Sequence, residues 1–246
     1  MKAIVLAAGK GTRLMSEQFQ LPKVLREANG RPLLGYVLEN IGYIEKKDTV
    51  IVIGYMGDKV REFAGEDYNF ATQSEQKGTG HAVMMTRELL EDYDGDILIL
   101  YGDMPLFKAE TYRGICDKHA ESGAALTLLT AVVDNPPAYG RIIHDADGNI
   151  TDIIEEKDAT PEQKQIKELN VGVYVVKGSE LFKALDKVGN NNKQGEYYLT
   201  DLPKILIAEG KKVESYTTYD TNEIVGVNTI AELEFCEKIL TDRTKG

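Results

Sequence analysis

The sequence predicts an α/β fold, in which a doubly wound, mostly parallel sheet carries helices on both faces and a β-hairpin insertion. Short apolar runs alternate with helical patterns from the first residue onward, which is the rhythm of βαβ units. After about residue 136 the rhythm changes, and two short apolar runs flank a turn that contains Gly, which is typical of a β-hairpin. We find no internal repeat and no sharp change of composition, so the 246 residues are expected to form one α/β domain.

The first half of the chain is expected to supply three buried strands and three helices. Compact runs of β-branched residues, alanine and leucine are typical of strands that are covered on both faces. These runs occupy residues 3–7, 50–53 and 97–100. Helical patterns are found at residues 33–44, 81–91 and 110–121. Pro32 stands at a favoured first position for the first of these helices.

The second half begins with the expected hairpin, in which residues 141–144 and 150–154 pair across the turn Asp147-Gly148-Asn149. A polar loop at residues 188–196 contains three consecutive Asn residues. Further strands are expected at residues 171–176, 212–218 and 223–227. The last two expected helices are residues 199–209 and 231–240.

The balance of charge excludes several partners. The chain has 29 Lys and Arg against 40 Asp and Glu, a net charge of −11, which argues against nucleic acid and anionic membrane because both are polyanions. Cys116 and Cys236 lie far apart with no paired motif, so neither a disulfide framework nor a zinc site is indicated. The chain lacks a signal-peptide pattern and a membrane-spanning apolar run, so we expect a soluble, cytoplasmic protein.

The loop after the first expected strand has the composition of a phosphate-binding turn. In the segment 6–14, Gly9 and Gly11 permit backbone conformations in which successive N–H groups bind an anion. The dinucleotide-binding pattern does not fit, because Leu14 stands where a third Gly is needed. The Walker pattern is also excluded, because no Gly-Lys-Ser or Gly-Lys-Thr run occurs at the required spacing.

Three cations accompany this turn. Lys10 and Arg13 lie within it, and Lys23 follows in the segment Pro22-Lys23-Val24-Leu25. The glycines alone would be explained by a tight turn between a strand and a helix. Together with the cations, they predict phosphate binding.

Ten short segments, spread over nearly the whole chain, resemble those of one family. They are LAAGKGTR, PKVL, GRP, QSEQKGTGHAV, YGDMPL, YGRI, EEKDAT, ELNVGVY, GEYYLTD and GVN. In number, order and spacing they resemble the sugar-1-phosphate nucleotidyltransferases. Among these, the chain looks most like the uridyltransferase half of the bacterial bifunctional enzymes that also carry a glucosamine-1-phosphate acetyltransferase. The resemblance implies a Rossmann-like, mixed sheet of the nucleotide-diphospho-sugar transferase type.

The resemblance also implies roles for individual residues. Contact with the nucleotide and its base is implied for Leu6, Ala7, Ala8, Gly9, Lys23, Gln73, Gly78, Thr79, Tyr101 and Gly102. Arg13, Lys23 and Asp103 are implied to be catalytic, the two cations by neutralising the triphosphate and the departing pyrophosphate. Asp103 and Asn228 are implied to hold Mg²⁺, the expected cofactor, and to contact the substrates. Contact with the amino sugar is implied for Gly140, Glu155 and Asn170.

The reaction implied is that of UTP with N-acetylglucosamine 1-phosphate, which gives UDP-N-acetylglucosamine and pyrophosphate. Another sugar 1-phosphate, dTTP in place of UTP, or a non-catalytic sugar-nucleotide sensor on the same fold are the alternatives. We expect residues 1–230 to form the nucleotidyltransferase domain and residues 231–246 a C-terminal helix or linker. No hexapeptide repeat follows, so the β-helix domain of the acetyltransferase is expected to be absent. The oligomeric state is left open.

Overall fold

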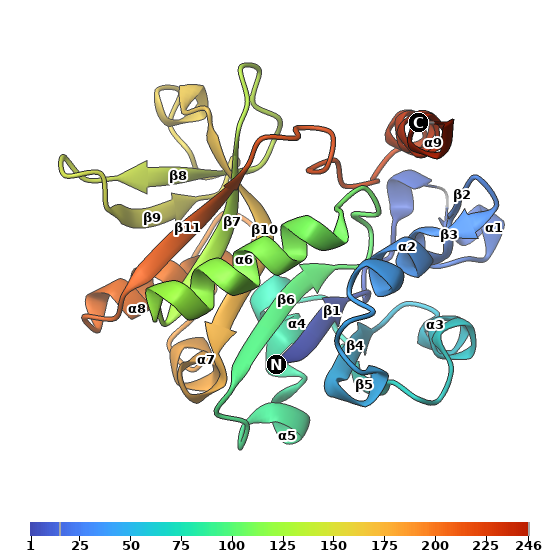
Figure 1. Cartoon of the computed structure of the whole chain (residues 1–246), viewed down its shortest axis with the longest axis horizontal. Coiled ribbons are helices and arrows are strands. Elements are labelled where there is room, and N and C mark those ends of the chain that lie inside the picture. The colour runs from blue at the N-terminus through green and yellow to red at the C-terminus, as the bar shows by residue number, and fades with distance from the viewer. Residues whose placement is uncertain (15, 246) are drawn as a thin grey trace.

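The computed structural model describes residues 1–14 and 16–245, and within them one mixed sheet of nine strands forms the core (Figure 1). In spatial order, seven of its strands are β11 (Val213–Thr218), β7 (Leu126–Val132), β10 (Glu168–Lys177), β6 (Asp96–Tyr101), β1 (Lys2–Leu6), β4 (Thr49–Ile53) and β5 (Asn69–Thr72). The remaining two, β8 (Gly140–His144) and β9 (Ile150–Ile154), form a hairpin that joins the sheet through β10.

The sheet is mostly parallel, as the sequence predicts. Strand β1 pairs in parallel with β4 on one side and β6 on the other, β4 with β5, and β7 with β11. Strand β10 runs antiparallel to all three strands with which it pairs, β6, β7 and β8. The sheet is therefore mixed because of β10, and the hairpin is attached where Gly140 lies opposite Asn170.

Helices cover both faces of the sheet. Side chains of β1 alternate between two apolar clusters, with Val5 in one and Ile4 in the other, because successive residues of a strand face opposite sides. The first cluster includes residues of α2 (Leu33–Asn40), α3 (Gly57–Ala64) and α6 (Ala109–Ser122). The second includes residues of α4 (Thr79–Met84), α5 (Arg87–Leu90), α7 (Gly178–Leu185) and α8 (Leu202–Ala208).

The C-terminal helix α9 (Ile230–Lys245) packs on a third, smaller apolar cluster at the end of the molecule where α2 begins (Figure 1). Leu233, Cys236 and Leu240 of α9 contact this cluster, which also contains Leu14 and Leu106. The short elements α1 (Ser16–Phe19), β2 (Glu27–Ala28) and β3 (Arg31–Pro32) lie in the same region. None of the helices in the described residues is long and apolar enough to cross a bilayer.

Two predicted elements are wrong. The helix expected at residues 81–91 is divided into α4 and α5 at Thr86, a buried residue whose hydroxyl donates to the carbonyl oxygen of Val83 at 2.7 Å. The strand expected at residues 223–227 is a turn followed by an irregular segment. There the N–H of Val227 donates to the carbonyl oxygen of Asp103 at 2.9 Å, in a loop rather than in a sheet ladder.

Candidate active site

The candidate site lies beyond the carboxyl ends of β1 and β6. These neighbouring strands end in register, with Leu6 opposite Tyr101, and the N–H of Gly102 donates to the carbonyl oxygen of Leu6 at 2.9 Å. After β1 the chain continues to β4, which lies next to β1 on one side. After β6 it continues to β7, which lies on the opposite side of the sheet, beyond β10. The chain therefore leaves β1 and β6 in opposite directions. Open α/β sheets form their ligand crevice at such a point.

Lys23 connects the two residues that were expected to hold a metal. Its ammonium contacts the carboxylate of Asp103 and donates to the side-chain carbonyl oxygen of Asn228 at 2.6 Å. The side chains of Lys23 and Asp103 are only 12% and 16% exposed, so solvent screens this contact weakly. The predicted cluster of Lys23, Asp103 and Asn228 is therefore present in the structure.

The glycine turn permits the close approach of Lys23. Gly11 has a φ of +67°, and a Cβ atom there would lie 2.6 Å from the Cβ of Lys23 and 2.8 Å from the hydroxyl oxygen of Ser16. Such separations are far below van der Waals contact, so only glycine allows this backbone to pack against Lys23. The glycine thus positions the lysine.

Asn228 is held by its own loop. Its side-chain Nδ2 donates to the carbonyl oxygen of Gly226 at 3.0 Å, and its backbone N–H donates to the carboxylate of Glu232 at 2.8 Å. With Nδ2 occupied in this way, the oxygen of the amide faces Lys23. The carboxylate of Asp103 contacts the same ammonium, so the loop brings the amide oxygen of Asn228 to the group that also binds Asp103.

A cavity of about 330 Å³ occupies the nucleotide side of this cluster. Its lining contains most of the predicted nucleotide residues, namely Leu6, Ala8, Gly9, Lys23, Gln73, Gly78, Thr79, Tyr101, Asp103 and Asn228. Ala7 and Gly102 are not part of the lining, and the side chain of Ala7 packs in the core. The sequence interpretation missed Val24, Gln76 and Ala82, which also line the cavity.

Hydrogen bonds from two glutamine side chains hold the wall of this cavity in place. Gln73 donates from Nε2 to the carbonyl oxygen of Gly78 at 3.0 Å and lies 3.1 Å from Nδ1 of His81. Gln76 donates to the carbonyl oxygen of Ala8 at 2.8 Å and so joins the base-side loop to the glycine turn. Gly78 has a φ of +102°, and a Cβ there would lie 2.6 Å from the carbonyl oxygen of Tyr197, so this wall requires glycine.

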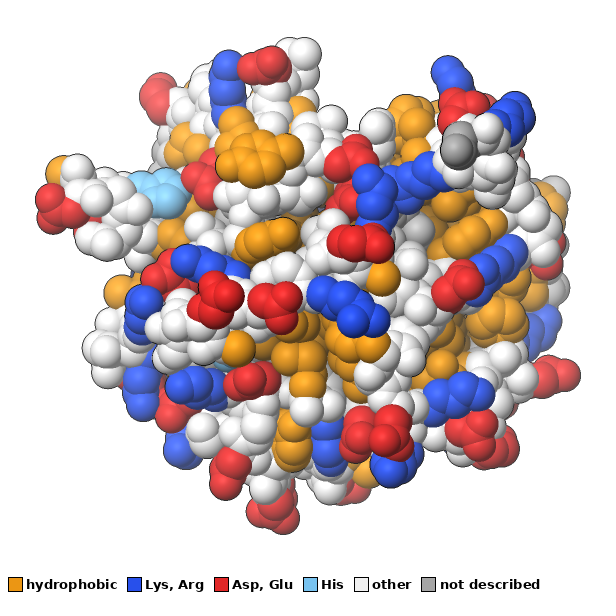
Figure 2. Space-filling model, viewed as in Figure 1, with side chains coloured by type: hydrophobic (Ala, Val, Ile, Leu, Met, Phe, Trp, Pro, Cys, Tyr) orange, Lys and Arg blue, Asp and Glu red, His pale blue; other side chains and the backbone are white. Residues whose placement is uncertain are grey.

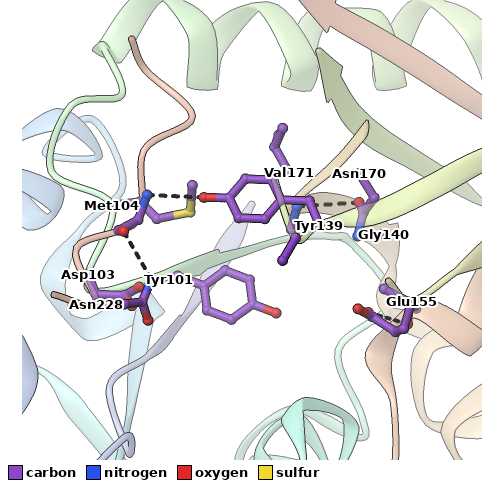
Figure 3. Close-up of a pocket in the computed structure, with 13 residues that line it drawn as sticks. Tyr101, Asp103, Met104, Tyr139, Gly140, Glu155, Asn170, Val171 and Asn228 are labelled. Carbon is purple, nitrogen blue, oxygen red and sulfur yellow. Dashed lines mark hydrogen bonds between the residues drawn. The ribbon is translucent and has the colours of Figure 1, made fainter. Parts of the chain in front are cut away.

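A second cavity, of about 210 Å³, lies on the other side of Asp103 and Asn228 (Figure 3). Its lining contains the three predicted sugar-contacting residues Gly140, Glu155 and Asn170. Met104, Tyr139, Thr200 and Gly172 also line it and were not predicted. Tyr101, Asp103 and Asn228 line both cavities, so the two cavities meet at these residues.

An irregularity in β10 shapes this second cavity. The pairing of β10 with β7 shifts register between Asn170 and Tyr174, and Gly172 within it has a φ of +82°. A Cβ at Gly172 would overlap the ring of Tyr101. The bulge leaves the amide of Asn170 free to donate to the hydroxyl of Tyr174 at 2.7 Å and to accept from the N–H of Gly172 at 3.3 Å.

Glu155 brings a partly desolvated carboxyl group to the sugar side. Burial raises the pKa of Glu155, the hydroxyl of Thr200 lowers it by donating to the carboxylate, and the carboxylates of Asp158 and Asp201 raise it further. The Thr200 hydrogen bond is 2.9 Å long. Burial also raises the pKa of the neighbouring Tyr101 phenol, which stays protonated and able to donate a hydrogen bond.

Arg13 is not brought into either of these cavities. It is exposed in a short 3-10 turn, Thr12–Leu14, and lines a third cavity of about 970 Å³ that adjoins the other two at Asn228. This cavity lies between Pro137 and Phe235 of α9, at the notch in the upper edge of the molecule in Figure 2. Lys10 instead pairs with the exposed Glu17 at 2.7 Å.

The donor set at the centre fits a small, hard cation. Within residues 1–14 and 16–245, no group of three or more His, Cys, Asp or Glu side chains is placed to hold a metal ion. The carboxylate of Asp103 and the amide oxygen of Asn228 converge on one positive group, the ammonium of Lys23. Mg²⁺ is commonly bound by one or two protein oxygens and completed by water and substrate phosphates, so these two residues fit it.

Comparison with known families shows which family the chain belongs to. A family model described as nucleotidyl transferase matches residues 2–222. The chain belongs to this family. Among curated relatives it is 42% identical over 241 residues to the bifunctional protein GlmU of Geobacillus sp. (strain WCH70), and 44% identical over 243 residues to that of Heliobacterium modesticaldum. These matches cover 98% and 99% of this chain but 52% of each relative, so the chain spans about half the length of the curated relatives it matches.

Two solved structures share this fold. A putative glucose-1-phosphate thymidylyltransferase from Bacillus anthracis superposes with a TM-score of 0.79 at 18% identity, covering 98% of this chain and 96% of that one. A UDP-glucose pyrophosphorylase in complex with UDP-glucose gives a TM-score of 0.77 at 15% identity, with 98% of both chains covered. The predicted mixed sheet of the nucleotide-diphospho-sugar transferase type is thus confirmed.

Proposed function

We propose that the protein joins UTP to N-acetylglucosamine 1-phosphate, forming UDP-N-acetylglucosamine and pyrophosphate, with Mg²⁺ as the cofactor. The observation that carries this proposal is the meeting of two cavities at Asp103 and Asn228, with the ammonium of Lys23 between these side chains. A nucleotide on one side and a sugar phosphate on the other would place their phosphates at this point. The identity to bifunctional GlmU proteins over nearly the whole chain supports the choice of substrates.

In this mechanism a phosphate oxygen of the sugar 1-phosphate attacks the α-phosphate of UTP, and pyrophosphate leaves from the opposite side. The second pKa of a phosphate monoester is near 6, so the attacking oxygen is largely ionised at neutral pH and needs no protein base. Lys23 offsets the negative charge that develops during transfer, as such reactions require. Mg²⁺, held by Asp103 and Asn228, would supply further charge stabilisation at the phosphates.

The remaining residues bind and orient the substrates. The ordered amides of Gln73 and Gln76 lie where the base would enter, beside the glycine turn. Glu155 and Asn170 offer a carboxylate and an amide to sugar hydroxyls. We propose that Arg13 acts on the outer phosphates across Asn228, since it lines the adjoining cavity. The substrates are small molecules, and we place the reaction in the cytoplasm, where UTP is formed.

A panel of sugar 1-phosphates and nucleoside triphosphates, with release of pyrophosphate as the readout, tests the proposal. We expect fastest turnover with UTP and N-acetylglucosamine 1-phosphate in the presence of Mg²⁺, and none in Asp103→Ala. A thymine methyl changes affinity by only about 1–3 kcal/mol in a pocket, so the comparison with dTTP and with glucose 1-phosphate is essential. Rapid turnover of another pair and none of this one would contradict the substrate assignment.

The assay also tests the sensor alternative. A sensor would bind UDP-N-acetylglucosamine but release no pyrophosphate from UTP with any sugar phosphate. The presence of Lys23, Asp103 and Asn228 in one cluster favours the enzyme, because a sensor for the product needs no group that stabilises transfer. We further propose that residues 1–230 form the nucleotidyltransferase unit and that the C-terminal helix α9 packs on it.

A further inference from the structure

The hydroxyl of Tyr139 joins two segments that are far apart in the sequence. It donates to the carbonyl oxygen of Ile224 at 2.7 Å, across 85 positions of the chain, and accepts the N–H of Gly226 at 3.1 Å. Both are ordinary hydrogen-bond lengths. One phenol thus holds two peptide groups of the loop that precedes Asn228.

The other end of Tyr139 belongs to the sugar side. The next residue, Gly140, begins β8 and lies opposite Asn170 of β10. The side chain of Tyr139 itself lines the sugar-side cavity (Figure 3). Tyr139 therefore extends from the hairpin segment, which supplies Gly140 and Glu155, to the loop that supplies Asn228.

Gly226 links Tyr139 to the side chain of Asn228. Its N–H is held by Tyr139, and its carbonyl oxygen accepts the side-chain amide of Asn228 at 3.0 Å. An asparagine side chain has one donor end and one acceptor end. Because the donor end is bound to Gly226, the acceptor end is directed to Lys23 and the Asp103 carboxylate.

The phenol is suited to this task because it remains neutral. Burial raises the pKa of Tyr139 to about 12, although the N–H of Gly226 lowers it in part. At any pH at which the protein works, the O–H therefore stays available to Ile224. The two hydrogen bonds persist together.

We propose that Tyr139 is a positioning residue, which orients the amide oxygen of Asn228 toward the divalent cation by holding the Gly226 peptide. This inference rests on the proposed function, because it requires Asn228 to be a ligand of that cation. Residues that orient metal ligands change metal affinity by about 10- to 100-fold when they are removed. Tyr139 touches no reacting atom in this role.

The test uses Mn²⁺ as the probe and follows free Mn²⁺ by electron paramagnetic resonance with the full chain and an equimolar amount of UTP. Because UTP itself binds Mn²⁺, a titration of UTP without protein is the reference from which the affinity of the protein complex is obtained. Tyr139→Phe keeps the ring and removes both hydrogen bonds, and we expect its dissociation constant for Mn²⁺ to rise about 10-fold. Tyr36→Phe is the matched control, because the Tyr36 hydroxyl donates at 2.8 Å to the carbonyl oxygen of Ala28, outside the site. It should bind Mn²⁺ as the wild type does.

A double-mutant cycle separates this role from a general loosening of the structure. In the Asn228→Ala background, Tyr139→Phe should no longer change the affinity for Mn²⁺, because the effect acts through Asn228. An unchanged affinity in the single variant, or an equal loss in both backgrounds, would overturn the inference while leaving the proposed function intact. If the wild type with UTP binds no more Mn²⁺ than UTP does alone, the inference and the Mg²⁺-dependent function are both wrong.

Discussion

The side-chain oxygen of Asn228 lies 2.6 Å from the ammonium of Lys23, although 205 positions of sequence separate the two residues. The same ammonium contacts Asp103. One positive group therefore lies between the two oxygen donors where a divalent cation is proposed to bind. With Asp103 and Asn228 as ligands of Mg²⁺, Lys23 would be free to pair with the phosphates of the substrates.

Replacement of Lys23 by Met tests this relationship. We expect kcat to fall by roughly 10²–10³-fold, which is typical for the loss of one group that stabilises transition-state charge. Lys46→Met is a suitable control, since Lys46 forms an exposed pair with Asp67 at 3.1 Å, and it should leave the rate of pyrophosphate release unchanged. A Lys23→Met enzyme that kept wild-type kcat would show that the ammonium does not act on the phosphates.

Two glycines of the turn give variants with different expected effects, one on stability and one on the binding of UTP. Gly11→Ala forces an L-residue into a left-handed conformation and brings its Cβ within 2.6 Å of Lys23, so we expect a loss of about 2 kcal/mol or more of unfolding free energy. Gly9→Ala meets no atom within 4 Å and should fold normally. Because Gly9 lines the nucleotide cavity, its variant should instead raise KM for UTP.

Urea denaturation and steady-state kinetics of the two glycine variants check this pair. The expected pattern is a lowered midpoint for Gly11→Ala and a raised KM with an unchanged midpoint for Gly9→Ala. Equal midpoints would mean that the backbone near Lys23 adapts to a side chain. An unchanged KM for UTP in Gly9→Ala would show that the nucleotide does not bind against this turn.

The raised pKa of Glu155 predicts that the stability of the protein depends on pH. Burial raises its pKa in the folded protein above the ordinary value of 4.5. Between these two pKa values the folded protein keeps a proton that the unfolded chain has lost, so the contribution of Glu155 to stability falls as the pH rises through this window. Glu155→Gln carries no charge and escapes this cost.

The unfolding free energy of Glu155→Gln, relative to the wild type, is therefore expected to increase as the pH rises above the ordinary pKa of 4.5 and to be constant at lower pH. Urea denaturation at several pH values measures it. A difference that is independent of pH would contradict the raised pKa. Because a neutral amide accepts hydrogen bonds less strongly than a carboxylate, the variant should also raise KM for the sugar 1-phosphate by roughly 5- to 10-fold.

The strands that line the centre of the sheet were predictable because they are continuous apolar runs. Strands β1, β4 and β6 are such runs, and they form the centre of the observed sheet. Strand β7 was missed because Thr127 and Thr130 interrupt its apolar pattern. Both are buried, and their hydroxyls bond to His119 and Thr217 at 2.9 Å. Strand β5 was missed because it is a four-residue edge strand.

The site was predictable as a set of motifs but not as a geometry. The glycine turn and the residues after β6 follow strands directly, so their meeting at one edge is a consequence of a parallel sheet. The contacts of Tyr139 with Ile224 and Gly226 depend on the packing of a hairpin against a loop, and no local pattern encodes them. For the same reason, the local pattern of residues 223–227 predicts a strand, whereas in the structure Glu223 accepts a hydrogen bond from the hydroxyl of Thr111 at 2.6 Å.

The start of α9 yields a last prediction, since Glu232 binds the backbone of Asn228, whereas Tyr139 acts on this residue through Gly226. Its carboxylate accepts the backbone N–H groups of Asn228 and Thr229, both at 2.8 Å, and the hydroxyl of Thr229 accepts the N–H of Glu232 at 3.3 Å. This reciprocal arrangement is a capping box. Glu232→Ala should cost about 1 kcal/mol of unfolding free energy and lower kcat several-fold, because the Asn228 peptide loses its acceptor.

Two further variants on the same helix make the measurement specific. A capping box accepts Gln as well as Glu, so Glu232→Gln should recover most of the stability and the rate. Glu234→Ala removes an exposed carboxylate of the same helix and should change the unfolding free energy by less than about 0.5 kcal/mol. If Glu232→Ala and Glu234→Ala gave the same urea midpoint and the same kcat, the capping box of α9 would have no part in holding Asn228.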